Sequence, residues 1–498
     1  PVVRSDITLY HYGYDLSPDK LREKRQRSRT LLEKQLADDP NDVFANFNMA
    51  QLLIGLHGTG DARTCERILG HARRVIEHAD PGNTGHIGYR LMAHHQMAIA
   101  LSALARYDEA EKYCRDALEE KDDYIDAILT LANICLAKAD LDAARAQYER
   151  FLSAVDSYRP RHECHDIIMH YLLGRHIARY GLATIYRLQG MIDEALKEYY
   201  AVLRECPAYL DTRYQAGMLH LRRGEPARAE DIVKQGLESD PDSIPLLIAM
   251  ARAVEAQGRG DRAVAWLETA LVRAPRDSDV MLALAKTLVR LGRRDDGGHY
   301  LEEMLTADPA NPRAAFAAAG VYFDLGEYER ARTLYRLSLE HNPFWPEAYT
   351  NLGNCFYKKE HYEAARAAYE TALALSPDSG LARRNLALTY ARRCEYDRAL
   401  AIIQDHAGGE SATTDMLKLT GDLLLLSGRY AEAIDRYERH LSTHPGDTDC
   451  LFHIAEAYRK SGYFESAAAG YRHILKIAPD HKPAAQRLEL VENVAPAN

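Results

Sequence analysis

Residues 351–377 read NLGNCFYKKEHYEAARAAYETALALSP, and residues 421–445 read GDLLLLSGRYAEAIDRYERHLSTHP. The two stretches share one pattern, in which a small residue is followed by a second small residue and then by proline. In the first stretch these residues are Gly353, Ala365 and Pro377. Proline fits where a helix begins or cannot continue. The pattern therefore predicts two helices, joined by a short turn and ended by proline.

The pattern returns every 34 residues along the second half of the chain. A turn signal separates the two small residues in most copies, and it is glycine, which accepts the positive φ of a helix C-cap. The small residues indicate positions where two helices approach closely, because a larger side chain would push the backbones apart. The prolines in phase are Pro207, Pro241, Pro275, Pro309, Pro343, Pro377, Pro445 and Pro479, and the turn glycines are Gly190, Gly224, Gly258, Gly292, Gly326, Gly428 and Gly462.

In these positions the sequence resembles the tetratricopeptide repeat family. The resemblance implies an all-α fold, a right-handed superhelix (an α-solenoid) of about twelve helix pairs with a C-terminal capping helix. One pair cannot bury its apolar face alone, so neighbouring pairs must stack. The expected organisation is a strand-like tail at 1–17, an N-terminal helix with atypical units at 18–156, an insertion at 157–173, regular 34-residue units at 174–481, and the capping helix and tail at 482–498.

Composition narrows the classes of function. The 498 residues include 73 acidic and 63 basic side chains, a net charge of −10. A nucleic-acid surface would need a basic stripe, so no nucleic-acid partner is expected. The eight cysteines contain no C-x-x-C pair, which favours reduced thiols and a cytoplasmic location. The longest pure leucine run, Leu423–Leu426, is far shorter than the ~20 apolar residues of a membrane span.

The first residues do not follow the repeat. Ile7, Leu9 and His11 alternate with other side chains in a strand-like period of two. The stretch ITLYHYGY, followed by a basic helix and the turn DDPND, resembles the junction in bacterial family-2 glycosyltransferases that carry tetratricopeptide repeats. That resemblance implies a GT-A catalytic domain before Pro1, with His11 near its metal or diphosphate. The alternative is an ordinary N-terminal extension.

The chain itself contains little that predicts catalysis. A GT-A domain needs an acidic D-x-D pair for a divalent metal, and the pairs present are Asp240/Asp242, Asp277/Asp279 and Asp447/Asp449. All three lie at turns between repeats, where aspartate is expected as an N-cap. No phosphate-binding or hydrolase motif occurs, so we expect no catalytic residue and no cofactor. His162 and His165 are weak metal candidates in the insertion, and a chance cluster is favoured.

The first helix of each repeat is implied by the resemblance to line a concave groove. Asn351 and Asn385 are one repeat apart, so we expect their amides to form a ladder that bonds the backbone of an extended peptide. A chaperone-type carboxylate clamp is rejected, because Thr350 and Leu419 stand where that clamp needs cations. The predicted peptide-binding residues are Phe316, Phe323, Asn351, Asn354, Tyr357, Lys358, Arg384, Asn385 and Arg392.

The sequence therefore predicts a protein-binding or peptide-binding scaffold. The preferred hypothesis is the C-terminal region of a bacterial family-2 glycosyltransferase, which recruits the acceptor for the catalytic domain. The alternative is a freestanding assembly scaffold with no linked enzyme, which self-associates through an incompletely capped end.

Overall fold

The computed structural model describes residues 18–57, 60–80, 82–157, 171, 174–404 and 414–494. Every regular element within these residues is a helix, as the sequence predicts. The chain divides into two compact units, an N-terminal unit (Pro1–Trp266) and a C-terminal unit (Leu267–Asn498).

The helices of the N-terminal unit are α1 (Pro18–Asp38), α2 (Val43–His57), α3 (Ala62–His78), α4 (Thr84–Ala103), α5 (Tyr107–Glu120), α6 (Ile125–Ala137), α7 (Leu141–Ser157), α8 (Arg175–Leu188), α9 (Ile192–Glu205), α10 (Leu210–Arg222), α11 (Pro226–Ser239) and α12 (Ile244–Glu255). The next helix, α13 (Gly260–Arg273), contains the division between the units.

The helices of the C-terminal unit are α14 (Ser278–Arg290), α15 (Arg294–Ala307), α16 (Pro312–Asp324), α17 (Tyr328–His341), α18 (Pro346–Lys358), α19 (Tyr362–Leu375), α20 (Gly380–Arg392), α21 (Tyr396–Gln404), α22 (Thr414–Leu426), α23 (Tyr430–Thr443), α24 (Thr448–Lys460), α25 (Phe464–Ile477) and α26 (Lys482–Val494).

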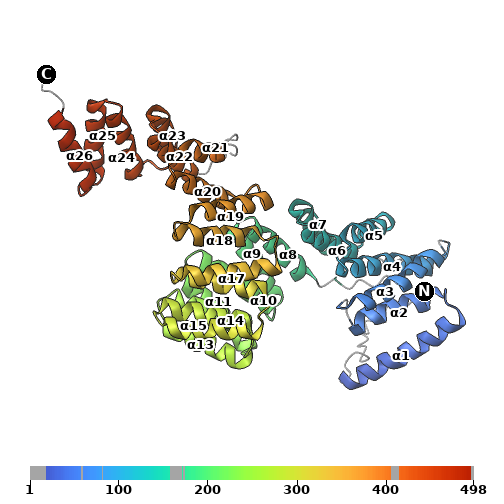
Figure 1. Cartoon of the computed structure of the whole chain (residues 1–498). Helices are drawn as coiled ribbons and strands as arrows, with labels where there is room; N and C mark the ends of the chain where they lie inside the picture. Colours follow the sequence, from blue (N-terminus) through green and yellow to red (C-terminus); the bar gives the residue numbers. More distant parts are fainter. Residues whose placement is uncertain are drawn as a thin grey trace. The chain divides into compact units, whose positions relative to one another are not determined.

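Consecutive helices form antiparallel pairs in both units (Figure 1). The two helices of a pair pack together, as α8 does with α9 and α18 with α19, and the second helix then contacts the first helix of the next pair. Many first helices also contact each other, including α16 with α18 and α18 with α20. This arrangement is an α-solenoid, in which each pair buries its apolar face against its neighbours.

The small residues lie where the sequence places close helix contacts. Ala365 is fully buried in α19. A Cβ atom built on Gly353 would stand 2.5 Å from the ring of Tyr369, and one built on Gly421 would stand 2.6 Å from the ring of Tyr437. Real side chains essentially never approach so closely, so both positions exclude any residue larger than glycine unless the ring moves.

The turns within the pairs also follow the prediction. The seven turn glycines have φ between +74° and +85°, the left-handed region that glycine enters without strain. The same turn position holds Glu360 in the pair α18–α19 and Cys394 in the pair α20–α21, with φ of 61° and 62°. The repeat therefore imposes the left-handed turn even where glycine is missing.

The capping helix α26 packs on α25, as expected for the end of a solenoid. Ala484 and Val491 are buried, and Arg487 Nε lies 3.3 Å from a carboxylate oxygen of Glu456. None of the described helices combines the length and the apolar character that a membrane span requires.

Several predicted features lie outside the described residues. These are the strand-like tail with His11, and most of the insertion at 157–173 with His162 and His165. Of that insertion, Ser157 ends α7, and the backbone N–H of Tyr171 donates to Asp126 at 3.0 Å.

Candidate functional site: the groove of the C-terminal unit

The nine predicted groove residues lie on α16, α18 and α20, the first helices of three consecutive pairs. Five of them line one cavity of about 250 Å³, which we call the groove cavity. Two further residues, Tyr369 from the second helix α19 and Leu388 from α20, complete its wall. The lining residues are Phe323, Asn354, Tyr357, Lys358, Tyr369, Asn385 and Leu388.

The asparagines of the groove form a hydrogen-bonded chain. The amide of Asn385 donates to Asn354 Oδ1 at 2.8 Å, and the amide of Asn354 makes a long bond of 3.4 Å to Asn351 Oδ1. Asn351 and Asn385 are therefore connected through Asn354. The ladder expected from Asn351 and Asn385 alone thus lacked its middle member, Asn354. Asn354 joins them because it lies one helical turn after Asn351 on the same face of α18.

Asn354 is also held by a hydrogen bond from the second helix of its pair, α19. The hydroxyl of Tyr369 donates to Asn354 Oδ1 at 2.7 Å, so this oxygen accepts two hydrogen bonds. Tyr369 is almost fully buried, and burial raises the pKa of its hydroxyl well above the ordinary value. The hydroxyl thus stays protonated and fixes the Asn354 amide with its oxygen turned inward. The amide nitrogens of Asn354 and Asn385 each carry two N–H groups, and each uses one of them in a bond to a neighbouring asparagine.

One cationic side chain, that of Lys358, is among the residues that line the groove cavity. Lys358 is exposed, and its ammonium group makes no hydrogen bond or ion pair with the residues that the structure describes. Arg392 donates through Nε to the hydroxyl oxygen of Tyr357 at 3.1 Å. Phe323 and Leu388 contribute apolar surface. The cavity therefore combines amide donors, a cation and apolar contact, which together suit an acidic peptide segment.

The remaining predicted residues are not among those that line this cavity. Phe316 stacks on Trp345, with ring centroids 4.4 Å apart and planes inclined by 21°. Arg384 is exposed on α20 next to Asn385. Phe316 thus has an aromatic partner within the chain, and its exposed area as a ligand contact is reduced.

Sequence reasoning missed the tyrosine anchor, although its signal is present. Tyrosines of the second helices donate to a polar side chain fifteen residues earlier on the first helix of the same pair. Tyr148 donates to Asn133 at 2.6 Å, and Tyr437 donates to Asp422 at 2.7 Å. The same spacing relates Tyr369 to Asn354, which lies two 34-residue periods before Asp422, whereas Asn133 is out of that phase. A search for polar residues in that phase would have found Asn354 and Asp422.

The first aspartate of each D-x-D pair lies at a helix end, and two of the three are N-caps. Asp277 and Asp447 are N-caps, and each accepts from the backbone N–H groups two and three residues later. The expectation was wrong for Asp240, which ends α11 and accepts from the N–H of Asp242 at 3.2 Å. The N-cap position of α12 belongs instead to Ser243.

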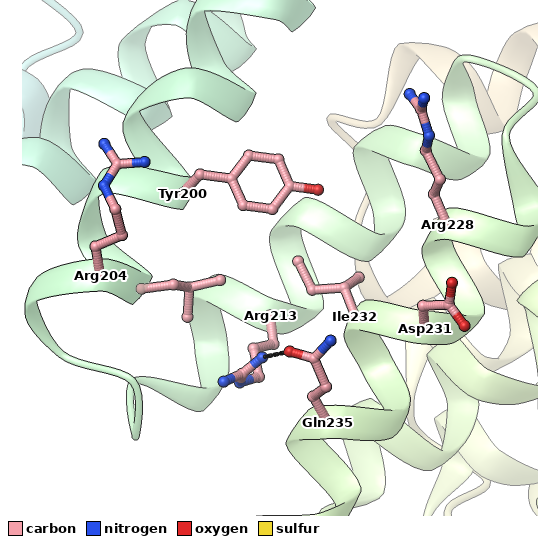
Figure 2. Close-up of a pocket in the computed structure, with 8 residues that line it drawn as sticks. Tyr200, Arg204, Arg213, Arg228, Asp231, Ile232 and Gln235 are labelled. Carbon is pink, nitrogen blue, oxygen red and sulfur yellow. Dashed lines mark hydrogen bonds between the residues drawn. The ribbon is translucent and has the colours of Figure 1, made fainter.

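A second hollow, of about 510 Å³, lies in the N-terminal unit between α9, α10 and α11. It is lined by Tyr200 and three arginines, and Arg213 donates to Gln235 at 2.8 Å. Figure 2 shows Arg204 and Arg228 on opposite sides of Tyr200, with their guanidinium groups far apart. The cations do not converge on one point, so this hollow is a less defined binding site than the groove cavity.

The tetratricopeptide repeat model matches the chain at residues 101–158, 186–253, 220–287, 288–354 and 424–489, which is more than half of it. A second model of the same repeat matches residues 346–379, which contain α18 and α19. The chain belongs to the tetratricopeptide repeat family. Repeats of this family bind protein or peptide partners, and five of the seven residues that line the groove cavity lie within the matched ranges.

Among solved structures, the chain is similar to one in the APC/C hetero-tetramer Cut9–Hcn1, at 14% identity and a TM-score of 0.37, with 86% of this chain and 93% of that chain covered. It is also similar to human IFIT1 as a dimer with PPP-AAAA, at 17% identity and a TM-score of 0.37, covering 74% of this chain and 94% of that chain. The comparison with curated proteins gives no match.

Proposed function

We propose that this tetratricopeptide repeat array recruits a partner protein by binding an extended, acidic segment in the groove of α16, α18 and α20. One observation carries the proposal: amide donors, apolar walls and the unpaired Lys358 meet in a single cavity of the described structure. An extended peptide offers backbone carbonyls to the Asn354 and Asn385 amides and a carboxylate to Lys358.

The test uses fluorescence anisotropy of a fluorescein-labelled peptide of alternating glutamate and leucine. Charge reversal in Lys358→Glu is expected to weaken its affinity roughly tenfold. The matched control is Lys359→Glu, because Lys359 is the exposed C-cap residue next along α18 and does not line the cavity. Equal affinities of the two variants, or tighter binding of a peptide with lysine in place of glutamate, would contradict the proposal.

The amides are tested separately. Asn385→Ala removes the bond to Asn354 and one donor in the cavity, and is expected to weaken peptide binding about fivefold, since one net hydrogen bond contributes about 1 kcal/mol. The contribution of Lys358 should fall with added salt, whereas that of Asn385 should not. The two parts of the site are thereby distinguished.

We further propose that the recruited protein is the acceptor of a bacterial, cytoplasmic family-2 glycosyltransferase whose GT-A domain precedes Pro1. The support is the ITLYHYGY stretch and the basic helix after it, which resemble the end of such a domain. Reading the gene upstream of Pro1 tests this: about 200–250 residues with a D-x-D pair are expected. A freestanding scaffold that associates with itself is the alternative, and sedimentation of the purified chain would reveal it.

A further inference from the structure

The turn between α23 and α24 brings together three side chains that bind metals in other proteins. They belong to His440 in the last turn of α23, Asp447 before α24 and Cys450 in its first turn. His440 Nε2 lies 3.0 Å from Asp447 Oδ2, and Cys450 Sγ lies 3.5 Å from the same oxygen. Within the described chain, the three ligand atoms all lie within 4.8 Å of one another.

The positions of these atoms are fixed by the helix ends. Asp447 is the N-cap of α24, and its Oδ1 accepts from the backbone N–H groups of Asp449 and Cys450 at 3.0 and 3.1 Å. This arrangement leaves Oδ2 turned toward His440. His440 and Cys450 are buried, with exposed fractions of 4% and 0%. Solvent reaches the cluster through the Asp447 side chain, which is 20% exposed.

Two of the three separations come close to those of a tetrahedral zinc centre, and the third, between His440 Nε2 and Cys450 Sγ, is below 4.8 Å. Bonds of about 2.0–2.3 Å to nitrogen, oxygen and sulfur place neighbouring ligand atoms roughly 3.3–3.8 Å apart. The two separations of 3.0 and 3.5 Å therefore require shifts of a few tenths of an ångström. An imidazole, a carboxylate and a thiolate are a ligand set that suits a borderline-soft cation.

Charge is balanced as well. A divalent ion with one carboxylate and one thiolate is neutral. Lys418 from α22 donates to Asp447 Oδ2 at 3.0 Å and also lies 3.6 Å from Asp449 Oδ2. When the metal binds, Lys418 retains Asp449 as its partner, and the thiol proton of Cys450 passes to the solvent.

We propose that His440, Asp447 and Cys450 form a three-ligand site for a divalent transition-metal ion, Zn²⁺ in the first place, with water as the fourth ligand. The site is independent of the groove cavity. It would link α23 to α24 and so join two consecutive repeats.

The full chain, treated with a chelator and dialysed, is titrated with Co²⁺ under reducing conditions. We expect a thiolate-to-cobalt charge-transfer band and the visible bands of four-coordinate Co²⁺, both bleached by one equivalent of Zn²⁺. Cys450→Ser should abolish the charge-transfer band, and His440→Gln should weaken Co²⁺ binding at least tenfold. Cys394→Ser is the control, because Cys394 is an exposed thiol in the preceding repeat.

Lys418→Met distinguishes a metal site from a simple ion-pair network. Lys418→Met removes the ammonium group that competes with the metal for Asp447, and it should tighten Co²⁺ binding roughly fivefold. If the three side chains form only an ion-pair network, Lys418→Met will not tighten Co²⁺ binding. Circular dichroism tests whether each variant is folded. If Cys450→Ser or His440→Gln does not fold, the other of these two variants is used in its place. Absence of the charge-transfer band in the wild type, or its loss in Cys394→Ser but not in Cys450→Ser, would overturn the proposal.

Discussion

Two stretches of the C-terminal unit use the same tyrosine anchor with acceptors of different charge. We call them the groove segment (α18–α21) and the terminal segment (α22–α25). In the groove segment Tyr369 donates to the uncharged Asn354, which also accepts a hydrogen bond from the Asn385 amide. In the terminal segment the corresponding acceptors are the carboxylates of Asp422 and Glu456.

The carboxylates draw in cationic and imidazole groups. His453 Nδ1 lies 3.1 Å from Asp422, and Arg459 lies 2.8 Å from Glu456. Lys418 is likewise paired with Asp447. The groove segment has an amide at the anchor position of α18, and Lys358 makes no ion pair within the described residues. The terminal segment has a carboxylate at that position, and its charge is used within the chain.

The largest effect is expected where the two segments should not differ. Gly353→Ala and Gly421→Ala each place a Cβ within 2.6 Å of a buried tyrosine ring. Both should destabilise the chain by about 3 kcal/mol, the upper range for overpacking. Gly380→Ala is the control, because its Cβ meets nothing within 4 Å. Urea unfolding measures the effect, and a large difference between the first two variants would break the structural equivalence of the segments.

Removing the tyrosine hydroxyls should separate the segments. Tyr437→Phe deletes a bond to a carboxylate and is expected to cost about 2 kcal/mol, whereas Tyr369→Phe deletes a bond to an amide and should cost about 1 kcal/mol. Hydrogen exchange of α22 and α18 reports each loss locally. If Tyr369→Phe proves the more damaging change, the charge of the acceptor is not what distinguishes the segments.

The turn residues allow a stabilising change in the groove segment alone. Glu360 has φ of 61°, which costs a residue other than glycine roughly 1–2 kcal/mol. Glu360→Gly should therefore stabilise the chain by about 0.5–1 kcal/mol after the greater entropy of the unfolded glycine is subtracted. Gly428→Ala, in the matching turn of the terminal segment, should have the opposite sign. Thermal unfolding of both variants checks this.

The smallest effect concerns acid. Burial raises the pKa of Glu456, but its bonds to Arg459 and Tyr471 outweigh burial and hold the pKa below the ordinary value. Because the pKa of Glu456 is lower in the folded than in the unfolded state, its carboxylate stabilises the protein above about pH 4.3. This stabilisation is lost as the pH falls through the folded-state pKa. The difference in stability between wild type and Glu456→Gln should be below about 1 kcal/mol at pH 7 and vanish once the pH falls below the lowered pKa of Glu456. A difference that does not change with pH would show that the charge of Glu456 is irrelevant.

The sequence by itself determined the repeat. Helix pairs, left-handed turns and close contacts depend on residue types at fixed local spacings, so the 34-residue period identifies Gly353, Ala365 and Gly428 without a structure. The resemblance to the tetratricopeptide family implied that Phe323, Asn354 and Lys358 face the concave groove, and these three residues line one cavity.

Tertiary structure decided the bonds between side chains. The oxygen of Asn354 accepts hydrogen bonds from Asn385 and from the Tyr369 hydroxyl. The second bond is possible because Tyr369 reaches Asn354 from the second helix of the pair. Asp240 and Asp277 follow the same sequence pattern, yet Asp277 is the N-cap of α14 and Asp240 is the C-cap of α11. His440, Asp447 and Cys450 converge across a turn whose path no local spacing specifies. Such contacts depend on rotamers and on distances between helices, which differ from repeat to repeat while the period stays the same.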